Sequence, residues 1–416
     1  MLHHRAILVS AAAFMLVTAG WGQNFGTVEL PTSIADAGTQ VVAVFNKNPS
    51  NNAYLGYGEG PAVDAQGNLF FSEHVSSHRI WKVTPQGTGT IFATDNKSNG
   101  IEFDPQGRMI VAQNGALGAF DKDGKRTTLP MTGSPASGEF NDLSIGSNGG
   151  IFFTNYSGNT FFYRNPSGAV TSYVSSGNPL GVNVPNGIEW VEEKNLLLVC
   201  SSTDHKVYRF DVTSAGVVSN KREFSSITVR NADGLTVDEK GNVYVASWEL
   251  GSVQVFDSTG KFMGKVTVKN ANPADNNQNA NVSNCVLGDD KNLYITGDGG
   301  AYKVQLKVGP RKRPGTVAVR GSSQWRRANE MRLSNSVFHP SRQALGISLP
   351  LIGGLYTVSI YDARMRQVWS TSSSSAGVEW RGENHQGAPL PAGNYLIMAT
   401  SAGQRAATAP VVLLSR

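Results

Sequence analysis

The sequence has few cysteines, little charge and, beyond its first residues, no long apolar run. Cys200 and Cys285 are the only cysteines in 416 residues, too few for a disulfide framework, and we expect two unpaired thiols. Cys200 ends the run LLLVC and is expected in the core. Charged residues make up 16% of the chain. No stretch after the start approaches the roughly 20 apolar residues of a membrane span, so a stable membrane anchor is not expected.

The first 23 residues have the order of a secretory signal peptide. A short basic start, MLHHR, precedes the apolar run AILVSAAAFMLVTAG, and the small residues Gly20 and Gly22 follow. A membrane anchor is the alternative, but the run is short for one. We therefore expect the mature protein to be secreted, periplasmic or at the cell surface.

The net charge of +5 has a local origin. Between Arg311 and Arg332 lie seven basic residues and one acid, which leaves the rest of the chain at about −1. A basic stretch of this kind is more often a solvated linker than a nucleic-acid-binding arm, and no basic surface with interleaved aromatic residues accompanies it. Nucleic acid is not an expected partner.

A strand-like phrase occurs six times in the middle of the chain. Examples are EGPAVDAQGNLFFSE, NGIEWVEEKNLLLVC and DGLTVDEKGNVYVAS. The first polar residues of the phrases, called the lead residues below, are spaced 40, 42, 45, 47 and 51 apart. A period in this range with four short strands per unit is typical of a β-propeller. The lead residues are Glu59, Asn99, Asn141, Asn186, Asp233 and Asn284.

The strand pattern predicts an all-β chain whose propeller covers residues 24–308. Alternating strands flank glycine turns such as AQGN and EKGN, and helical periodicity is nearly absent. The sixth repeat supplies only three clear strands, whereas an extra strand-like segment, Val41–Asn46, precedes the first repeat. We expect this segment to close the ring as the outer strand of the sixth blade, which also covers an exposed sheet edge.

The character of the sequence changes after Val308. Residues 309–334 are basic and contain Pro and Ser, which predicts a linker. Residues 335–416 contain alternating strands separated by Gly, Pro and Asn turns. At this length the pattern predicts a small C-terminal β-sandwich.

The six lead residues are expected to form a ring at one mouth of the propeller channel. Each opens the innermost strand of its blade, and these strands line the channel. Two carboxylates and four amides offer oxygen ligands only, a set that suits Ca²⁺ or Mg²⁺ and lacks the imidazole and thiolate preferred by Zn²⁺. The plainer interpretation is that Asn-Gly and Asp-Gly pairs are turn formers. This interpretation is weaker for the six lead residues together, because the hairpin turns of the repeats have their own glycines. Cys285 follows a lead residue and is expected to approach the pocket wall.

In order and spacing, these phrases resemble the gluconolactonase/regucalcin (senescence marker protein) family of six-bladed propellers. The matching phrases are EGPAVD, FNDLSI, PNGIEW, ADGLTVD and SNCVLGDDKNLYITG. The resemblance implies a divalent metal on the channel axis, Ca²⁺ before Mg²⁺, Mn²⁺ or Zn²⁺. It also implies a small-molecule substrate such as a sugar lactone. The implied metal ligands are Glu59, Asn186 and Asp233, with Asn141 as a further ligand of metal or substrate; Asn99 and Asn284 are not carried over.

One departure concerns substrate specificity. Some family members have an arginine two residues before the Asn of the third blade, where this chain has Glu139, and the segment SPASGEFND lacks the Arg–Pro elements of bacterial gluconolactonases. We expect this departure to change the specificity for sugar-acid lactones more than it changes metal binding.

The chemistry expected of such a site is metal-assisted ester hydrolysis. The candidate catalytic residues are Asp233 and Asn141, with His74 as an alternative base, although a lone His at a strand end is more often a rim or packing residue. Glu73 and Asp142 are possible pocket acids, but Asp142 should point opposite to Asn141 on a strand, which favours a structural role. The alternatives are a non-catalytic propeller that binds a sugar or protein, and a phosphotriesterase-type hydrolase.

The C-terminal region is similar to the sorting domains of type IX-secreted proteins. The phrases are YTVSIYDARMRQVWS and VEWRGENHQGAPLPAGNYLI, with Met365 where glycine is usual. The resemblance implies the secretion machinery as a partner. The alternative is a generic Ig-like spacer; either is non-catalytic.

Overall fold

The structure is a computed structural model, and it confirms an all-β chain. It describes residues 23–74, 78–94, 97–133, 138–274 and 279–311, and in the C-terminal region residues 332–333, 337–340, 344–348, 356–362, 366–373, 377–401 and 404–414. The N-terminal segment expected to be a signal peptide, except Gln23, lies outside these residues. Among them no helix is long and apolar enough to cross a membrane, and the one helical element is a single 3-10 turn, Glu192–Lys194.

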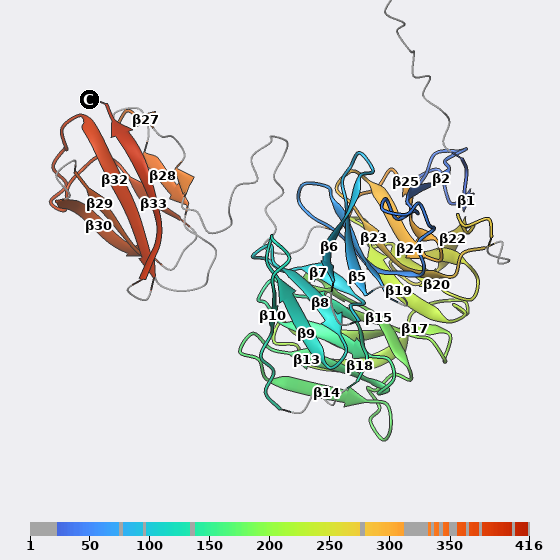
Figure 1. Cartoon of the computed structure of the whole chain (residues 1–416). Coiled ribbons are helices and arrows are strands. Elements are labelled where there is room, and N and C mark those ends of the chain that lie inside the picture. Colours follow the sequence, from blue (N-terminus) through green and yellow to red (C-terminus); the bar gives the residue numbers. More distant parts are fainter. Residues whose placement is uncertain are drawn as a thin grey trace, which may run out of the picture.

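Six antiparallel sheets form the predicted propeller (Figure 1). Blade 1 contains β3 (Gly58–Val63), β4 (Leu69–Glu73), β5 (Arg79–Val83) and β6 (Gly89–Thr94); blade 2 contains β7 (Ile101–Phe103), β8 (Met109–Gln113), β9 (Ala116–Phe120) and β10 (Arg126–Thr128); blade 3 contains β11 (Phe140–Ile145), β12 (Ile151–Asn155), β13 (Thr160–Arg164) and β14 (Val170–Val174). Blade 4 contains β15 (Pro185–Val191), β16 (Leu196–Ser201), β17 (Lys206–Val212) and β18 (Val218–Glu223); blade 5 contains β19 (Ala232–Val237), β20 (Val243–Ser247), β21 (Ser252–Phe256) and β22 (Phe262–Val268); blade 6 begins with β23 (Val282–Leu287), β24 (Asn292–Gly297) and β25 (Gly300–Gln305).

The innermost strands β3, β7, β11, β15, β19 and β23 contact one another in a closed cycle. The fourth strand of blade 6 is β2 (Val41–Phe45), which pairs antiparallel with β25, so the segment expected to close the ring lies there. A further strand not foreseen from the sequence, β1 (Gly26–Glu29), adds a fifth strand to blade 5 by pairing with β22. The N-terminal segment therefore ties together blade 5 and blade 6, and the ring closes within blade 6.

The hydrophobic core lies between adjacent blades. Phe161 of blade 3, for example, belongs to the same buried cluster as Trp190 and Phe210 of blade 4. A sheet covered on both faces exposes neither side to water, which is why strands such as β12 (IFFTN) and β16 (LLLVCS) are apolar almost throughout. Cys200 and Cys285 are buried, unpaired thiols, as expected. Cys285 packs in a core cluster of blades 5 and 6 and does not line the central pocket, which corrects its expected approach to the pocket wall.

Close approach of neighbouring innermost strands explains why glycine follows most lead residues. A Cβ on Gly187 would lie 2.4 Å from the carbonyl oxygen of Asp233, and a Cβ on Gly60 would lie 2.1 Å from that of Asn99. Gly60 also has a φ of +44°, which side chains rarely adopt. The Asn-Gly and Asp-Gly pairs are therefore required by packing around the channel axis, and they are not hairpin turns.

The stretch expected to be a linker, residues 309–334, belongs to folded units at both ends. The Gly309 N–H donates to Glu239 Oε1 at 3.1 Å, and the Arg311 guanidinium is buried against blade 4. At the other end, β26 (Arg332–Leu333) pairs with a strand of the C-terminal unit. Both boundaries are therefore shifted inward from the prediction, and residues 312–331 lie outside the described part of the chain.

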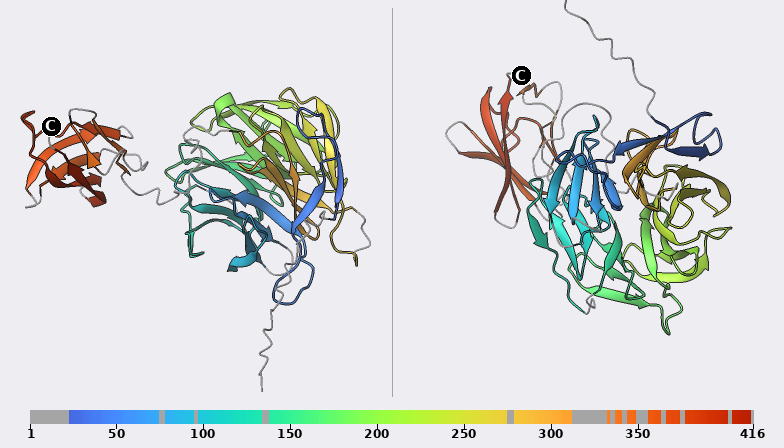
Figure 2. Two further views of the ribbon diagram at one scale, coloured as in Figure 1. Left: turned by 90° about the horizontal axis from the view of Figure 1, so that it is seen from above. Right: turned by 45° about the vertical axis from the view of Figure 1, so that its right-hand side comes forward.

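The C-terminal unit consists of two sheets around its own core, as the predicted small sandwich requires. One sheet contains β26, β28 (Leu345–Ser348) and β31 (Gly377–Trp380); the other contains β27 (Val337–Phe338), β33 (Gln404–Leu413), β32 (Gly393–Ser401), β29 (Tyr356–Tyr361) and β30 (Gln367–Ser373). Ile347, Trp380 and Ile397 are among the buried residues of this core. Figure 2 shows these strands in orange and red in two further views.

Candidate metal centre and active site

A cavity of about 270 Å³ opens at the channel mouth, where the lead residues gather. All four residues expected to hold a metal line it: Glu59, Asn141, Asn186 and Asp233. They come from blades 1, 3, 4 and 5, so only ring closure brings them together. The remaining lining residues are Tyr57, His74, Asn99, Glu139, Tyr156, Asn231 and Trp248.

A β-bulge at each of these four positions breaks the strand alternation. On β11 the paired residues are Phe140 with Asn155 and Leu143 with Phe153, so Asn141 and Asp142 together face one residue of β12. The same irregularity occurs beside Glu59 on β3, Asn186 on β15 and Asp233 on β19. Bulges change the direction of side chains next to functional sites. Here the bulge that recurs in these blades places the lead residues at the channel mouth.

The amide of Asn186 is held with its oxygen free. Its Nδ2 donates to Ser202 Oγ at 3.2 Å, and the Ser202 hydroxyl donates to the Ala232 carbonyl at 3.0 Å. Asn186 Oδ1, Asp233 Oδ1 and Asn99 Oδ1 are all buried without a hydrogen-bond partner. A buried polar atom left unpaired costs about 1–3 kcal/mol, so three such oxygens in one cavity suit a bound cation.

The carboxyl groups at the mouth have strongly raised pKa values. Burial raises the pKa of Glu59 to about 8, with a further contribution from the negative charge of Asp142. Burial, followed by the charges of Glu59 and Asp142, holds the pKa of Asp233 well above its usual range. Carboxylates that are buried together without a nearby cation resist ionisation, and a bound divalent cation would remove that resistance.

Asp142 and Asn284 lie outside the cavity lining and contact each other. Asn284 Nδ2 donates to Asp142 Oδ2 at 3.4 Å, and Asp142 Oδ1 accepts from the Leu143 N–H at 2.9 Å. Asn284 Oδ1 in turn accepts from the Cys285 N–H at 2.7 Å. This pair joins blades 3 and 6 across the ring; the structural role of Asp142 stays a prediction.

His74 and Glu139 form one wall of the cavity. His74 Nε2 lies 3.4 Å from Glu139 Oε1, and His74 Nδ1 lies 3.2 Å from the Ser98 carbonyl oxygen. Each ring nitrogen therefore already faces an oxygen atom of the protein, which suits a wall residue better than a base that removes a proton from substrate. Glu73, the other candidate acid, accepts from Trp81 Nε1 at 3.0 Å and does not line the cavity.

Several lining residues were not identified from the sequence. Tyr57, Tyr156, Asn231 and Trp248 lie in loops or at strand ends outside the repeated phrase, whereas Asn99 was expected at the mouth as a lead residue but not as a ligand. Trp248 is 36% exposed and Tyr156 is 37% exposed, so they form an aromatic rim.

The donor set fits a hard divalent cation. Carboxylate and amide oxygens are the ligands that Ca²⁺ and Mg²⁺ prefer, and the unpaired oxygens of the mouth face a common cavity. Within the described residues no three His, Cys, Asp or Glu side chains gather as a metal-binding group. A site here would therefore depend on the amide oxygens as well as on Glu59 and Asp233.

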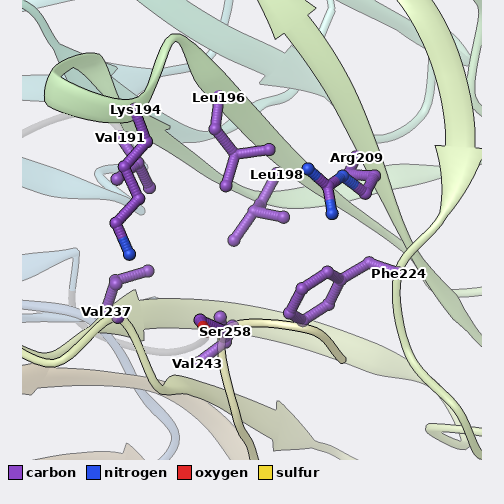
Figure 3. Close-up of a pocket in the computed structure, with 10 residues that line it drawn as sticks. Val191, Lys194, Leu196, Leu198, Arg209, Phe224, Val237, Val243 and Ser258 are labelled. Carbon is purple, nitrogen blue, oxygen red and sulfur yellow. The ribbon is translucent and has the colours of Figure 1, made fainter. Parts of the chain in front are cut away.

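A second, smaller cavity has a different character. It encloses about 90 Å³ between blades 4 and 5 and is lined mainly by apolar side chains such as Leu198, Phe224 and Val243, with Lys194 and Arg209 at its edges (Figure 3). No carboxylate or amide side chain lines it. It lacks the convergent oxygen atoms of the channel mouth.

The fold and cavity define a six-bladed propeller with an oxygen-lined pocket on its axis. Residues 57–298 match the SMP-30/Gluconolactonase/LRE-like region family, and the chain belongs to this family. The pentonolactonase XacC of Haloferax volcanii is 25% identical over 220 residues, which are 51% of this chain and 73% of that protein. The lactonase drp35 of Staphylococcus aureus is 27% identical over 235 residues, 50% of this chain and 69% of that one.

Solved structures share the fold at lower identity. A gluconolactonase from Xanthomonas campestris superposes with a TM-score of 0.57 at 20% identity, over 68% of this chain and 97% of its own. A calcium-binding protein, regucalcin, from Agrobacterium tumefaciens gives 0.52 at 17% identity, over 62% and 92%. At these identities the likeness establishes the propeller fold.

Proposed function

We propose that this chain is a divalent-cation-dependent lactonase that hydrolyses a sugar lactone or related cyclic ester at the channel mouth. The observation that carries the proposal is the convergence of Glu59, Asn141, Asn186 and Asp233 in one cavity. Two of them, Asn186 and Asp233, present unpaired buried oxygens. Lactonases among the sequence relatives support the same reaction class.

Each residue of the site has its own role in the proposed hydrolysis. Glu59, Asn186 and Asp233 hold the cation, with Ca²⁺ preferred. When bound, the cation supplies polarisation of the ester carbonyl. Asn141 orients the lactone ring of the substrate, and the aromatic rim covers the substrate. Asp233 accepts a proton from the attacking water, and the proton passes to the ring oxygen as the acyl–oxygen bond breaks, which gives a hydroxy acid.

The test is a panel of lactones and organophosphate triesters, measured with purified protein in Ca²⁺ and after chelation. We expect lactone turnover that chelation abolishes and that Asp233→Ala removes. Asp257→Ala changes an acid in an exposed turn and serves as the matched control. Triester turnover without lactone turnover would favour the phosphotriesterase alternative, and cation binding without either would favour a binding module.

We also propose that the protein is exported and that its C-terminal unit is a sorting domain. The order of residues 1–23 and the two phrases of the C-terminal strands support this. Removal of all residues after Arg311 should leave the propeller in the periplasm if the unit carries the sorting signal. Unchanged export of the truncated chain would indicate a spacer.

A further inference from the structure

The charged side chains that line the central cavity are almost all of one sign. Among the described residues that line it, Glu59, Glu139 and Asp233 are acidic, His74 is the single basic group, and none is Lys or Arg. Glu59 and Asp233 belong to the cation site proposed above. Glu139 therefore remains as a carboxylate facing the space that a substrate would occupy.

Glu139 is oriented by His74 and forms no ion pair with Lys or Arg in the described part of the chain. Its Oε1 lies 3.4 Å from His74 Nε2, and His74 is oriented by the Ser98 carbonyl on its other side. The Glu139 side chain is 39% exposed, so a carboxylate oxygen is accessible from the cavity. A carboxylate accepts hydrogen bonds from hydroxyl or ammonium groups and donates none when ionised.

Arg230, which is next to a lining residue, has its own partner. Arg230 precedes the lining residue Asn231, and its guanidinium lies 2.6 Å from Glu249 Oε1. The other polar groups of the wall, the Asn99 amide and the Tyr57 and Tyr156 hydroxyls, are neutral. Burial raises the pKa of Tyr57, with the charges of Asp233 and Glu59 adding to the effect.

We infer that Glu139 is a specificity-determining residue that selects uncharged or cationic, hydroxyl-bearing lactones and excludes lactones that carry phosphate or carboxylate groups. This inference rests on the proposed lactonase function. An anionic substituent in the cavity would meet Glu139 with no Lys or Arg among the described lining residues to compensate it. Two like charges about 4 Å apart near a protein surface repel strongly enough to reduce binding at least about tenfold.

The experiment compares glucono-1,5-lactone with its 6-phosphate, a pair that differs only in charge at one end. The wild type should have kcat/KM at least about tenfold higher for the neutral lactone. Glu139→Gln should reduce that preference, and Glu139→Arg should reverse it. Higher salt should weaken the preference, because Glu139 is partly exposed. Glu223→Gln, at an exposed carboxylate on the outer strand β18, should leave the preference unchanged.

Binding of the two corresponding lactams, which contain an amide in place of the ester, separates this inference from the proposed function. If calorimetry shows the same charge preference and the same reversal in Glu139→Arg while no lactone is hydrolysed, the proposed function fails and the inference stands. If wild type and Glu139→Arg rank the neutral and phosphorylated compounds alike in both assays, or if neither lactam binds, the inference is overturned.

Discussion

Arg311 Nη2 lies 2.6 Å from Glu189 Oε1, although Arg311 had been expected in a solvated linker. The same guanidinium also reaches Glu193 Oε2 at 3.1 Å and the Trp190 carbonyl at 2.6 Å. Glu189 lies on β15, the channel strand that carries Asn186 at its other end. The pair therefore fastens the end of the propeller chain to the strand that presents a candidate ligand.

Arg311→Ala should destabilise the propeller strongly. The Arg311 and Glu189 side chains are only 6% and 10% exposed, and removal of one partner leaves an uncompensated buried carboxylate, which costs about 3–5 kcal/mol. Urea unfolding measures the change. Arg222→Ala breaks an exposed pair with Asp211 and should cost under about 1 kcal/mol. Equal losses in the two variants would show that Arg311 contributes no more than a surface ion pair.

The stability of the cation-free protein should fall as pH rises. The folded-state pKa values of Glu59, Asp142 and Asp233 are raised, to about 8 for Glu59 and about 7 for Asp142. A carboxyl group whose pKa is higher in the folded than in the unfolded chain stabilises the fold fully below its unfolded pKa, near 4. This stabilisation is lost as pH rises through its folded pKa. In chelator, Tm should therefore decrease between about pH 5 and 8.

Added Ca²⁺ should raise Tm more at pH 8 than at pH 5, because only ionised carboxylates bind the cation well. Asp233→Asn should reduce both the pH dependence and the Ca²⁺ shift. Asp257→Asn is the control: this carboxyl lies in an exposed turn, where hydrogen bonds lower its pKa. A Ca²⁺ shift of equal size at both pH values would argue against cation binding by these carboxyl groups.

Ser202→Ala should weaken Ca²⁺ binding while leaving the ligands in place. The Ser202 hydroxyl holds the Asn186 amide with Oδ1 free, and the loss of such a supporting contact reduces metal affinity by about 10–100-fold. Ser201→Ala is the matched control, since the neighbouring Ser201 hydroxyl bonds the Asn183 carbonyl and does not contact Asn186. Calorimetric titration with Ca²⁺ distinguishes them; the same Kd in both variants would remove Ser202 from this role.

Gly187→Ala should destabilise the ring at blades 4 and 5. The added methyl group would lie 2.4 Å from the backbone oxygen of Asp233, which cannot move without shifting β19. Overpacking of this kind costs about 1–3 kcal/mol. Gly309→Ala, where the nearest atom is 3.9 Å away, is the control. Thermal unfolding that is unchanged in Gly187→Ala would mean that the innermost strands separate easily.

The repeat made the propeller and most of its site predictable. Six copies of one phrase fix strand order by local alternation and turn chemistry, and an equivalent position in each blade must face the same axis. Glu59, Asn141, Asn186 and Asp233 could therefore be grouped from spacing and family resemblance alone. Neither source assigned a role to Asn99, whose unpaired Oδ1 became evident only with the surrounding side chains in place.

The sequence by itself determined the elements that depend on near neighbours in the chain: the blade strands, the turns and the lead residue of each repeat. Tertiary structure decided what depends on distant segments. The burial of Arg311 joins residues more than 100 positions apart, and β1 pairs with β22 across most of the chain. Such contacts form only when the ring closes, because closure brings together atoms whose separation along the chain carries no periodic signal.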